Sequence, residues 1–521
     1  MSGADGSEIL IGIDAGTTVI KAVAFDLAGH QIAVASVPNV YTVRSSDGAA
    51  FQGMDQTWRD CVATLRMLGE KISGLATRTI GIAVTAQGDG TWLVGADNRP
   101  VTDGWIWLDA RAGSTVARLR SASGDRRRFE TTGTGLNACQ MGTQLAHLDT
   151  VSPELLDQAE VSLHPKDWLY LNLTGVRATD PSEANFTFGN FRTRTYDDAV
   201  IDALGLTGRR RLLPEILDGS QQAHPLLEAV ARQVGLRAGT PVSLGYVDVV
   251  CTAIGGGILT EGKPSACTII GSTGMHMRAM DAADVRLNEQ KSGYVMVLPF
   301  EGMVAQIQSN MASTLNIDWL LAMAEDLMRD MGAPTSRAAL IDRIDGWLSS
   351  TRPARMIFHP YISDAGERGP FVNPAARASL VGVNSSHRIP DLFRAVIEGL
   401  GMAARDCYAE MGPLPSEIRL TGGAARSRNL RDVLGAAVGA DVRVSGRQEA
   451  GAGGAAMMSA VAIGVYPDMA TCIDRWVTPE LGPAEPVDAA LAETYGRLFS
   501  SYLSSRLALA PVWDELAWNK D

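Results

Sequence analysis

Cysteine is sparse in this chain, and its spacing excludes two common roles. The six cysteines among 521 residues lie far apart, with no C-x-x-C pair and no histidine cluster beside them. A disulfide framework or a structural zinc site needs paired or clustered ligands, so neither is indicated. The sequence therefore predicts six buried thiols, at Cys61, Cys139, Cys251, Cys267, Cys407 and Cys472.

Long basic runs and long apolar runs are also missing. The formal net charge is −12, and no basic run exceeds the triplets at residues 126–128 and 209–211. Nucleic-acid binding depends on dense lysine and arginine contacts to phosphate, so no nucleic-acid partner is expected. The chain has no uninterrupted apolar stretch of about 18 residues and no signal-peptide pattern, so we expect no membrane partner and a cytoplasmic location.

Apolar residues are plentiful enough for more than one core. Hydrophobic residues make up 46% of the chain and charged residues 20%, as in ordinary folded proteins. Strand patterns at residues 8–14, 19–27 and 31–37, separated by glycine turns, predict an antiparallel meander. Residues 55–72 then carry apolar side chains at helical spacing and residues 79–88 return to a strand pattern, which predicts a crossover back to the sheet.

The second half of the chain repeats the first in type. Residues 265–280 again place a glycine-rich turn between two apolar runs. Residues 392–411 predict a helix, and residues 417–439 predict a strand, a glycine turn and a helix with Ser427 as its N-cap. We interpret the two halves as a structural repeat of one α/β unit.

The turn after the first strand carries residues that suit a metal-bound phosphate. Asp14, Gly16, Thr17 and Thr18 lie between the first two strand patterns. Glycine lets the backbone approach a ligand, and amides and hydroxyls can donate to phosphate oxygens. The Asp14 carboxylate would repel phosphate unless Mg²⁺ lies between them. The alternative is a polar turn in which these side chains satisfy only backbone groups.

Two further glycine turns complete a nucleotide-binding pattern. Residues 271–273 offer a second set of donors in the matching position of the second half. Residues 422–425 lie between a strand and a helix, where small side chains let a flat group rest against the backbone. Taken alone, each of these turns is equally consistent with a purely structural role. Together they predict a phosphate chain held between two hairpins, with a slot for a base.

Asp248 is an acidic residue in an apolar setting, among Val247, Val249 and Val250 near a predicted strand end. Burial of an unpaired carboxylate is costly, so this acid should be paired, exposed to a cleft or ready to accept a proton. A general base acting on an alcohol fits that description, and such proton transfer contributes about 10²–10⁴-fold in rate. A helix-capping aspartate is the alternative.

Ordered motifs along nearly the whole chain resemble the FGGY family of carbohydrate kinases. They are I-G-I-D-A-G-T-T at the start, W-I-W-L-D-A-R at 105–111, K-D-W-L-Y-L-N-L-T-G at 166–175, H-P-Y-I-S-D-A-G-E-R-G-P at 359–370 and L-T-G-G-A-A-R-S at 420–427. The resemblance implies an α/β fold of two ribonuclease-H-like domains, of the actin-like ATPase type, flanking a deep catalytic cleft. We place the N-terminal domain at residues 1–254 and the C-terminal domain at residues 255–521.

The family transfers the γ-phosphoryl group of ATP to a hydroxyl of a sugar or polyol, so the resemblance implies ATP and Mg²⁺ as cofactors. It implies that Asp14 and Asp248 hold the metal and that Asp248 takes the hydroxyl proton. Catalysis then consists mainly of positioning and charge neutralisation. The implied ATP-binding residues are Gly16, Thr17, Thr18 and Lys21 in the first loop, Gly271, Ser272 and Thr273 in the second, and Gly422, Gly423, Ala424 and Asn429 beside the adenosine.

The acceptor is predicted from the segment that follows residues 79–86. Where glycerol kinases carry Arg-Glu and xylulose kinases Met-His, this chain has Gly88-Asp89. The Q-G-D-G-T-W-L string is most similar to erythritol kinases, which implies phosphorylation of a terminal hydroxyl of a short uncharged polyol, with erythritol favoured. Asp89 can accept hydrogen bonds from hydroxyls and Trp107 can cover a carbon face. The implied polyol-binding residues are Gln87, Gly88, Asp89, Trp107 and Asp248.

Two alternatives stay open at this level. Another member of the family, acting on xylulose, ribulose, xylitol or glycerol, would share the same phosphate loops. A nucleotide-gated switch protein of the same superfamily would hydrolyse ATP without a sugar and would not need a base at Asp248. Assembly as a homodimer is compatible with either.

Overall fold

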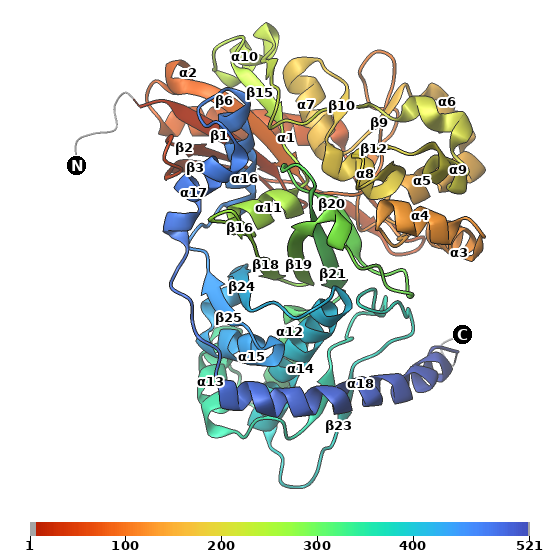
Figure 1. Ribbon diagram of the computed structural model, residues 1–521, viewed down its shortest axis with the longest axis vertical. Coiled ribbons are helices and arrows are strands. Elements are labelled where there is room, and N and C mark those ends of the chain that lie inside the picture. Colours follow the sequence, from red (N-terminus) through yellow and green to blue (C-terminus); the bar gives the residue numbers. More distant parts are fainter. Residues whose placement is uncertain (1–6, 519–521) are drawn as a thin grey trace.

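The computed structural model describes residues 7–518, which form two lobes along the long axis of the molecule (Figure 1). Each lobe is built on one six-stranded sheet. In spatial order, the first sheet contains β14 (His224–Pro225), β15 (Pro241–Leu244), β6 (Thr79–Ala86), β1 (Ile9–Ala15), β2 (Val19–Phe25) and β3 (Gln31–Pro38). The second contains β20 (Tyr294–Val297), β21 (Met303–Asn310), β19 (Gly274–Asp281), β18 (Ala266–Ile270), β24 (Glu417–Thr421) and β25 (Asp441–Val444).

The two sheets have the same strand plan. In the first, β1, β2 and β3 are antiparallel neighbours, and β6 and β15 extend the sheet in parallel from β1. In the second, β18, β19 and β21 are antiparallel, and β24 and β25 extend the sheet in parallel from β18. The meander, the crossover and the structural repeat expected from the sequence are therefore confirmed.

Helices cover both faces of the first sheet, because side chains along a strand point alternately to its two faces. Ile9, Ile11 and Ile13 of β1 pack into the core on one face, and Leu10 packs into the core on the other. The helices on the first face are α1 (Met54–Lys71), α7 (Pro165–Thr174) and α10 (Glu228–Val234), and those on the second are α11 (Asp248–Gly255), α16 (Ala450–Ala462) and α17 (Met469–Trp476).

Helix α16 reaches the first sheet from far along the chain, and glycine permits the contact. A Cβ atom on Gly12 of β1 would lie 2.1 Å from the carbonyl oxygen of Ala452 in α16. The helix itself is rich in glycine and alanine, AGAGGAAMMSAVA. Small residues on both elements let the two backbones approach closely. The domain boundary at residues 254 and 255 stays a prediction.

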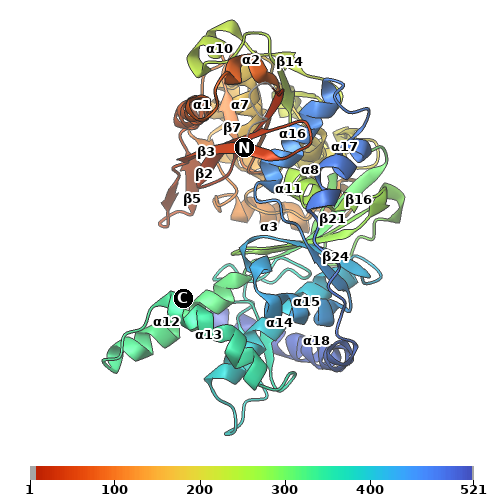
Figure 2. The same ribbon diagram turned by 90° about the vertical axis from the view of Figure 1, so that its left-hand side faces the viewer.

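The second lobe carries its helices mainly on the face that points away from the first lobe (Figure 1). Two of them, α12 and α13, project from the body in the side view (Figure 2). The helices of this lobe are α12 (Thr314–Asp330), α13 (Arg337–Ser350), α14 (Ile389–Glu410), α15 (Arg428–Val438) and α18 (Ala489–Trp518). The side chain of Ser427 accepts a hydrogen bond from the amide of Leu430 at 3.3 Å, so the expected N-cap of α15 is confirmed.

Between β6 and β15 the chain forms a helical cluster with its own apolar core. Its helices are α3 (Gly113–Ser121), α4 (Asp125–Thr132), α5 (Met141–Val151), α6 (Pro153–Gln158), α8 (Pro181–Phe188) and α9 (Asp198–Ala203). The remaining short elements include α2 (Leu75–Arg78), β4 (Thr42–Arg44), β5 (Ala49–Gln52), β7 (Trp92–Val94), β8 (Gly104–Trp105), β9 (Val161–Leu163), β10 (Ala178–Thr179), β11 (Gly189–Asn190), β12 (Thr195–Tyr196), β13 (Glu215–Ile216), β16 (Leu259–Thr260), β17 (Lys263–Pro264), β22 (Ile357–His359) and β23 (Ser379–Val381).

All six cysteines are buried and free, as expected from their spacing. Burial raises the pKa of the Cys61 thiol to about 12, which keeps it protonated. Within residues 7–518, no helix is both long enough and apolar enough to cross a membrane. The described part of the chain also contains no group of three or more histidine, cysteine, aspartate or glutamate side chains placed to hold a metal ion.

Candidate functional site

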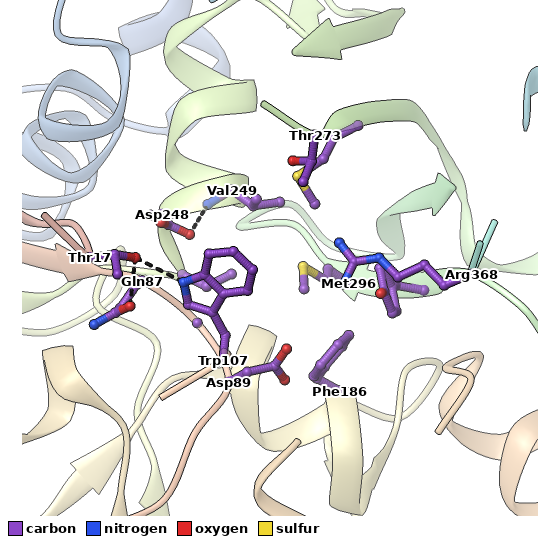
Figure 3. Close-up of a pocket in the computed structure, with 14 residues that line it drawn as sticks. Thr17, Gln87, Asp89, Trp107, Phe186, Asp248, Val249, Thr273, Met296 and Arg368 are labelled. Carbon is purple, nitrogen blue, oxygen red and sulfur yellow. Dashed lines mark hydrogen bonds between the residues drawn. The ribbon is translucent and has the colours of Figure 1, made fainter. Parts of the chain in front are cut away.

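Two cavities share helix α11, whose first two turns contribute lining residues to both. The smaller cavity, of about 260 Å³ (Figure 3), is lined by Thr17, Gln87, Gly88, Asp89, Trp107, Phe186, Val247, Asp248, Val249, Thr273, Met275, Tyr294, Met296 and Arg368. The larger cavity, of about 710 Å³, is lined by Asp14, Lys21, Thr252, Ile269, Thr421, Gly422, Ala425, Arg426, Arg431, Glu485 and the segment 444–451. Asp248, the first residue of α11, lines the smaller cavity. Thr252, one helical turn later, lines the larger cavity.

Asp248 is the first residue of α11 and lies four residues beyond the end of β15. The N-cap position belongs to Val247, so Asp248 is not the helix cap. Its Oδ1 accepts a hydrogen bond from the amide of Val249 at 2.6 Å. Burial raises the pKa of Asp248 well above its usual value, and the nearby carboxylate of Asp14 raises it further. The side chain is therefore a stronger base than an exposed aspartate.

Asp14 lies at the end of β1, opposite Lys21 of β2 in the strand register. Burial raises the pKa of Asp14 to about 6, even though the charge of Lys21 lowers it. The Lys21 ammonium is itself paired with Glu449, which joins the first lobe's sheet to the segment before α16 at 2.7 Å. The carboxylates of Asp14 and Asp248 line different cavities but lie close enough for the charge of Asp14 to raise the pKa of Asp248.

Thr17 belongs to a hydrogen-bonded wall of the smaller cavity. Its hydroxyl donates to Gln87 Oε1 at 2.8 Å and accepts from Trp107 Nε1 at 2.8 Å. Gln87 Nε2 in turn donates to Gln52 Oε1 at 2.6 Å. The hydroxyl of Thr17 therefore orients Trp107, and only the backbone amide of this residue is left to meet a phosphate. The expectation that Thr17 lines a phosphate loop stays a prediction.

Gly88 and Asp89 form a tight corner of the smaller cavity. A Cβ atom on Gly88 would lie 2.6 Å from Val247 Cγ2 and 3.0 Å from Glu183 Oε1, so a larger side chain has no room there. Asp89 has a φ of +59°, which is uncommon for a residue other than glycine. Burial raises the pKa of Asp89, although the thiol of Cys139, which donates to its Oδ2 at 3.4 Å, favours the charged form.

A cluster of buried charged residues packs against Gly88, on the side away from the cavity. The wholly buried ammonium of Lys166 contacts carboxylates of both Asp167 and Asp180 at 2.5 Å. His164 contacts Asp167 at 3.2 Å and Glu183 at 3.4 Å. Burial raises the pKa of Glu183 to about 7. Because buried charges need partners, these residues fix the position of α8 beside the cavity.

The second hairpin lies across the smaller cavity from Thr17. Thr273 lines the cavity, and the amide of Gly271 donates to the carbonyl of Thr273 at 3.1 Å to close the turn. The Ser272 carbonyl accepts from the Ser313 amide at 2.7 Å, and Ser272 is exposed. Both threonine-bearing hairpins therefore meet at one cavity (Figure 3).

The third glycine turn lines the larger cavity. Gly422 has a φ of +98°, and a Cβ atom there would lie 2.6 Å from the carbonyl oxygen of Ile270, so only glycine fits. Gly423 and Ala424 follow in a short 3₁₀ helix at Gly423–Arg426. Asn429 lines a neighbouring cavity, which shares only Arg431 and Glu485 with the larger one. Thr18 is exposed and lines neither of the two cavities.

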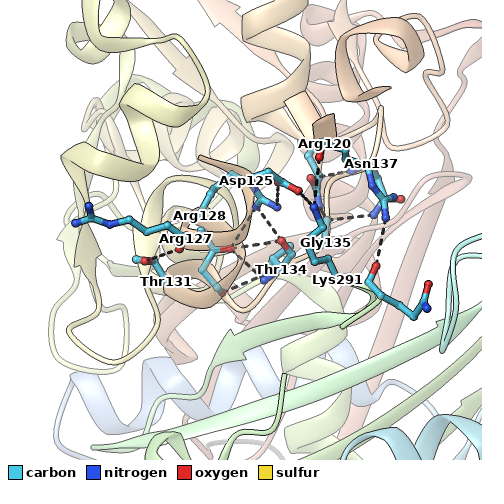
Figure 4. A network of polar contacts seen from close by, with 12 residues as sticks. Arg120, Asp125, Arg127, Arg128, Thr131, Thr134, Gly135, Asn137 and Lys291 are labelled. Atoms are coloured by element: carbon cyan, nitrogen blue, oxygen red, sulfur yellow. Dashed lines mark hydrogen bonds and ion pairs between the residues drawn. The ribbon is translucent and has the colours of Figure 1, made fainter. Parts of the chain in front are cut away.

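The two lobes also contact each other beside the smaller cavity (Figure 4). Lys291 of the second lobe pairs with Asp125 of α4 and donates to the carbonyl of Arg120 at 3.3 Å. Asp125 is also held by Arg128 at 2.9 Å, and the amide of Gly135 donates to the carbonyl of Gly293 at 2.9 Å. These bonds fix the strand that follows, where Tyr294 lines the cavity.

Several lining residues were not predicted from the sequence. Phe186, Tyr294, Met296 and Arg368 come from three separate segments, and nothing in their local patterns indicates a shared cavity. Arg368 lies within the G-E-R-G-P motif that contributed to the family resemblance. The arginine of that motif is the one sequence signal that could have marked Arg368 as a lining residue.

The chain matches the models of the FGGY family of carbohydrate kinases, for the N-terminal domain over residues 9–255 and for the C-terminal domain over residues 266–463. It is 62% identical over 513 residues to the erythritol kinase of Brucella abortus (strain 2308), covering 98% of each chain. It is 27% identical over 428 residues to the xylulose kinase of Escherichia coli (strain K12), covering 81% of this chain and 84% of that protein.

Solved structures resemble the whole described chain. Ligand-bound xylulose kinase from Lactobacillus acidophilus superposes with a TM-score of 0.87 at 22% identity, covering 98% of this chain and 100% of that one. Plasmodium falciparum glycerol kinase with ADP superposes with a TM-score of 0.82 at 16% identity, covering 97% and 99%. At such identities the likeness establishes a common fold.

Proposed function

The chain belongs to the FGGY family of carbohydrate kinases, and on that premise we propose that it transfers the γ-phosphoryl group of ATP to a terminal hydroxyl of erythritol. The observation that carries the proposal is the 62% identity to an erythritol kinase over 98% of both chains. The smaller cavity supports it, because about 260 Å³ lined by Asp89, Trp107 and Asp248 suits a short polyol better than a large sugar.

The larger cavity is the proposed ATP site. Its floor is formed by Gly422 and by the segment that leads into α16, and Lys21 and Arg426 supply positive charge along its walls. Because α11 and the first hairpin separate it from the smaller cavity, the phosphate end of a bound nucleotide would reach the polyol between Asp14 and Thr273. This arrangement supports in-line transfer, which depends on positioning.

Asp14 and Asp248 fit a divalent cation such as Mg²⁺. Both carboxylates are buried enough to have raised pKa values, and the carboxylates of Asp14, Glu183 and Asp89 all act to raise that of Asp248. A hard cation with oxygen ligands is the group that such a pair accepts. When bound, it would neutralise charge on the phosphates.

Asp248 is the proposed general base. Its carboxylate accepts the proton of the attacking hydroxyl while the hydroxyl oxygen bonds to the γ-phosphorus and the bond to the β-phosphate oxygen breaks, which releases ADP. The Thr17–Trp107 wall orients the carbon chain, and the hairpin at residues 271–273 closes over it. Aromatic and methionine side chains line the remaining walls, which reduces the contact of a bound polyol with water.

Acceptor-dependent ADP release tests the proposal. The purified protein is assayed with Mg-ATP and erythritol, glycerol, xylitol, xylulose or ribulose, with a reaction lacking any acceptor as the control. The expected result is the highest kcat/KM on erythritol and little turnover without an acceptor. A clearly higher kcat/KM on xylulose or glycerol would refute erythritol as the acceptor, and equal turnover without an acceptor would favour a nucleotide-gated switch.

The same proposal includes a cytoplasmic location, because ATP and its phosphorylated products are metabolites of that compartment. It also includes assembly as a homodimer. Cell fractionation measures the first, and sedimentation equilibrium of the purified protein measures the second.

A further inference from the structure

One charged side chain of the smaller cavity has no part in the phosphoryl transfer described above. Arg368 enters the cavity from the loop between β22 and β23 in the second lobe, whereas Asp89 and Asp248 come from the first lobe (Figure 3). Among the described residues that line this cavity, Arg368 is the only cation. Its charge therefore needs an explanation in terms of the ligand or of Asp89.

The guanidinium of Arg368 is anchored on one side only. Its Nη2 donates to Ser309 Oγ at 2.9 Å, and its Cζ lies 6.0 Å from the centre of the Tyr294 ring. Its Nε is buried and has no hydrogen-bond partner within residues 7–518. Buried donors are nearly always paired in folded proteins, so an unpaired one at a cavity indicates a ligand.

Asp89 carries an unpaired acceptor, the complement of the unpaired donor on Arg368. Its Oδ2 accepts from the Cys139 thiol at 3.4 Å, but its Oδ1 is buried and lacks a partner in the described part of the chain. The backbone of Asp89 is held in the left-handed region at a φ of +59°, which costs energy for a residue with a side chain. A strained backbone and an unpaired acceptor at the same residue both indicate a binding role.

An unpaired donor and an unpaired acceptor at one cavity define the chemistry of the ligand. A hydroxyl can donate to Asp89 while it accepts from Arg368. A carboxylate would satisfy Arg368 but would be repelled by Asp89, and an ammonium group would behave in the opposite way. Neutral hydroxyls are the groups that satisfy both residues.

We propose that Arg368 is a specificity-determining residue for the acceptor, and that with Asp89 it binds the hydroxyl at the end of the polyol opposite the one that is phosphorylated. The inference rests on the proposed function and extends it. The distance between Asp248 and the Arg368–Asp89 pair then determines how long a polyol must be for its two terminal hydroxyls to reach both. An acceptor that lacks the far hydroxyl leaves Arg368 Nε and Asp89 Oδ1 unpaired, and sites built to bind a hydroxyl reject such analogues strongly.

The test compares erythritol with glycerol, which is one carbon and one hydroxyl shorter. Steady-state kinetics are measured for the wild type, Arg368→Met and Arg368→Lys. Arg377→Met is the matched control, since Arg377 lies in the same loop, donates only to the carbonyls of Pro374 and Ala376 and does not line the cavity. Arg368→Met is expected to lower kcat/KM for erythritol about 10- to 100-fold, the usual effect of losing a hydrogen bond to a charged group.

The loss on glycerol is expected to be no more than about threefold, so the preference for erythritol falls while the KM for ATP stays the same. Arg368→Lys should give an intermediate preference, because it keeps the charge without the planar donor fork. Arg377→Met should behave as the wild type. Thermal unfolding of each variant separates misfolding from loss of recognition.

A double variant that combines Arg368→Met with Asp89→Asn provides a second measurement. If both residues bind one hydroxyl, the double variant loses less on erythritol than the product of the two single losses. Equal losses on erythritol and glycerol in both Arg368 variants, or fully multiplicative losses, would overturn the inference and leave the proposed function intact. A wild-type protein that does not phosphorylate erythritol would overturn both.

Discussion

Burial of a single carboxylate determines what Asp248 can do. The side chain lies at the start of α11, where desolvation and the neighbouring Asp14 raise its pKa well above the usual value. An acid with a raised pKa holds a proton more firmly and is therefore a better acceptor for the proton of an alcohol. The same burial makes the ionised form costly for stability, which is the expected trade-off if Asp248 is the base we propose.

Replacement of Asp248 by Asn is expected to reduce kcat about 10²–10⁴-fold, the usual contribution of a positioned base. The KM for Mg-ATP should change less than kcat, because Asp248 lines the acceptor cavity and Asp14 still offers a carboxylate to the cation in the larger cavity. Acceptor-dependent ADP release measures both constants. Asp342→Asn, an exposed aspartate of α13, is the control and should match the wild type. An Asp248→Asn variant that keeps more than about a tenth of kcat would rule out the base.

Trp107→Phe removes the indole donor that holds Thr17 at 2.8 Å and leaves a less well defined cavity wall. The KM for erythritol is expected to rise on the order of tenfold, as for loss of one hydrogen bond and part of an aromatic contact. The KM for ATP should not change. Trp319→Phe on α12, where the side chain is 39% exposed and distant from the cavity lining, serves as the control. A change confined to the KM for ATP would contradict this placement.

At the scale of elements, the contact between β1 and α16 fixes the position of Asp14, one of the two carboxylates of the proposed site. Asp14 ends β1, and a Cβ atom on Gly451 of α16 would lie 2.6 Å from its carboxylate. The strand and the helix can approach this closely only because Gly12 has no side chain. Helix α11 packs against the same face of the sheet and carries Asp248. Three elements that are distant in sequence thus bring two carboxylates together.

Gly12→Ala is expected to destabilise the protein by about 3 kcal/mol or more, since the new methyl group would meet backbone atoms that cannot rotate away. The predicted clash is at 2.1 Å from the carbonyl oxygen of Ala452. Urea unfolding measures the change. Gly346→Ala in the middle of α13, where a Cβ atom meets nothing within 4 Å, is the control. The control should stabilise by about 0.5–1 kcal/mol, and equal effects in both variants would refute the close approach.

At the scale of the whole molecule, one apolar core runs from the first sheet to the second. It includes Leu10 and Val23 of the first sheet, Ile254 of α11 and Met277 and Ile307 of the second sheet. The contacts of Lys291 with α4 join the lobes again beside the acceptor cavity. Charged residues of the site are therefore enclosed between two bodies, and their titration affects the stability of the entire fold.

The pH dependence of stability tests this enclosure through Asp14. Its pKa is about 6 in the folded protein against the ordinary value of 3.8, so the folded state binds the proton more tightly than the unfolded state. The stabilisation from protonated Asp14 is full below about pH 4 and is lost as the pH rises through about 6. Asp14→Asn removes this loss, so the variant should gain stability relative to the wild type as the pH rises from 4 to 8.

The gain should be up to about 3 kcal/mol, the equivalent of two pKa units, and smaller in proportion to the partial exposure of the carboxylate. Urea unfolding at both pH values in EDTA measures it. Repeating the titration with Mg-ATP provides the control, because ligand binding stabilises the wild type and should shrink or reverse the difference. A difference that does not vary with pH would contradict the raised pKa.

Local sequence patterns were sufficient to predict the strands of both meanders, the crossover helix and the N-cap at Ser427. Those features depend on alternation, helical periodicity and capping chemistry, all of which act over a few residues. Asp248 was recognised as unusual for the same reason, since an acid among valines stands out locally. The sequence placed it near a strand end, with a helix cap as the alternative, and did not decide between them, because the boundary between a strand and a helix is decided by packing.

The sequence by itself determined the repeated α/β plan, the family and the candidate catalytic acids, because these are written in short-range patterns and ordered motifs. Only the tertiary structure decided which side chains share a cavity. Arg368 and Asp89 are 279 positions apart, and no local pattern links them. They face one cavity because the two lobes pack against each other, and such long-range contacts depend on the packing of the complete chain rather than on any segment of it.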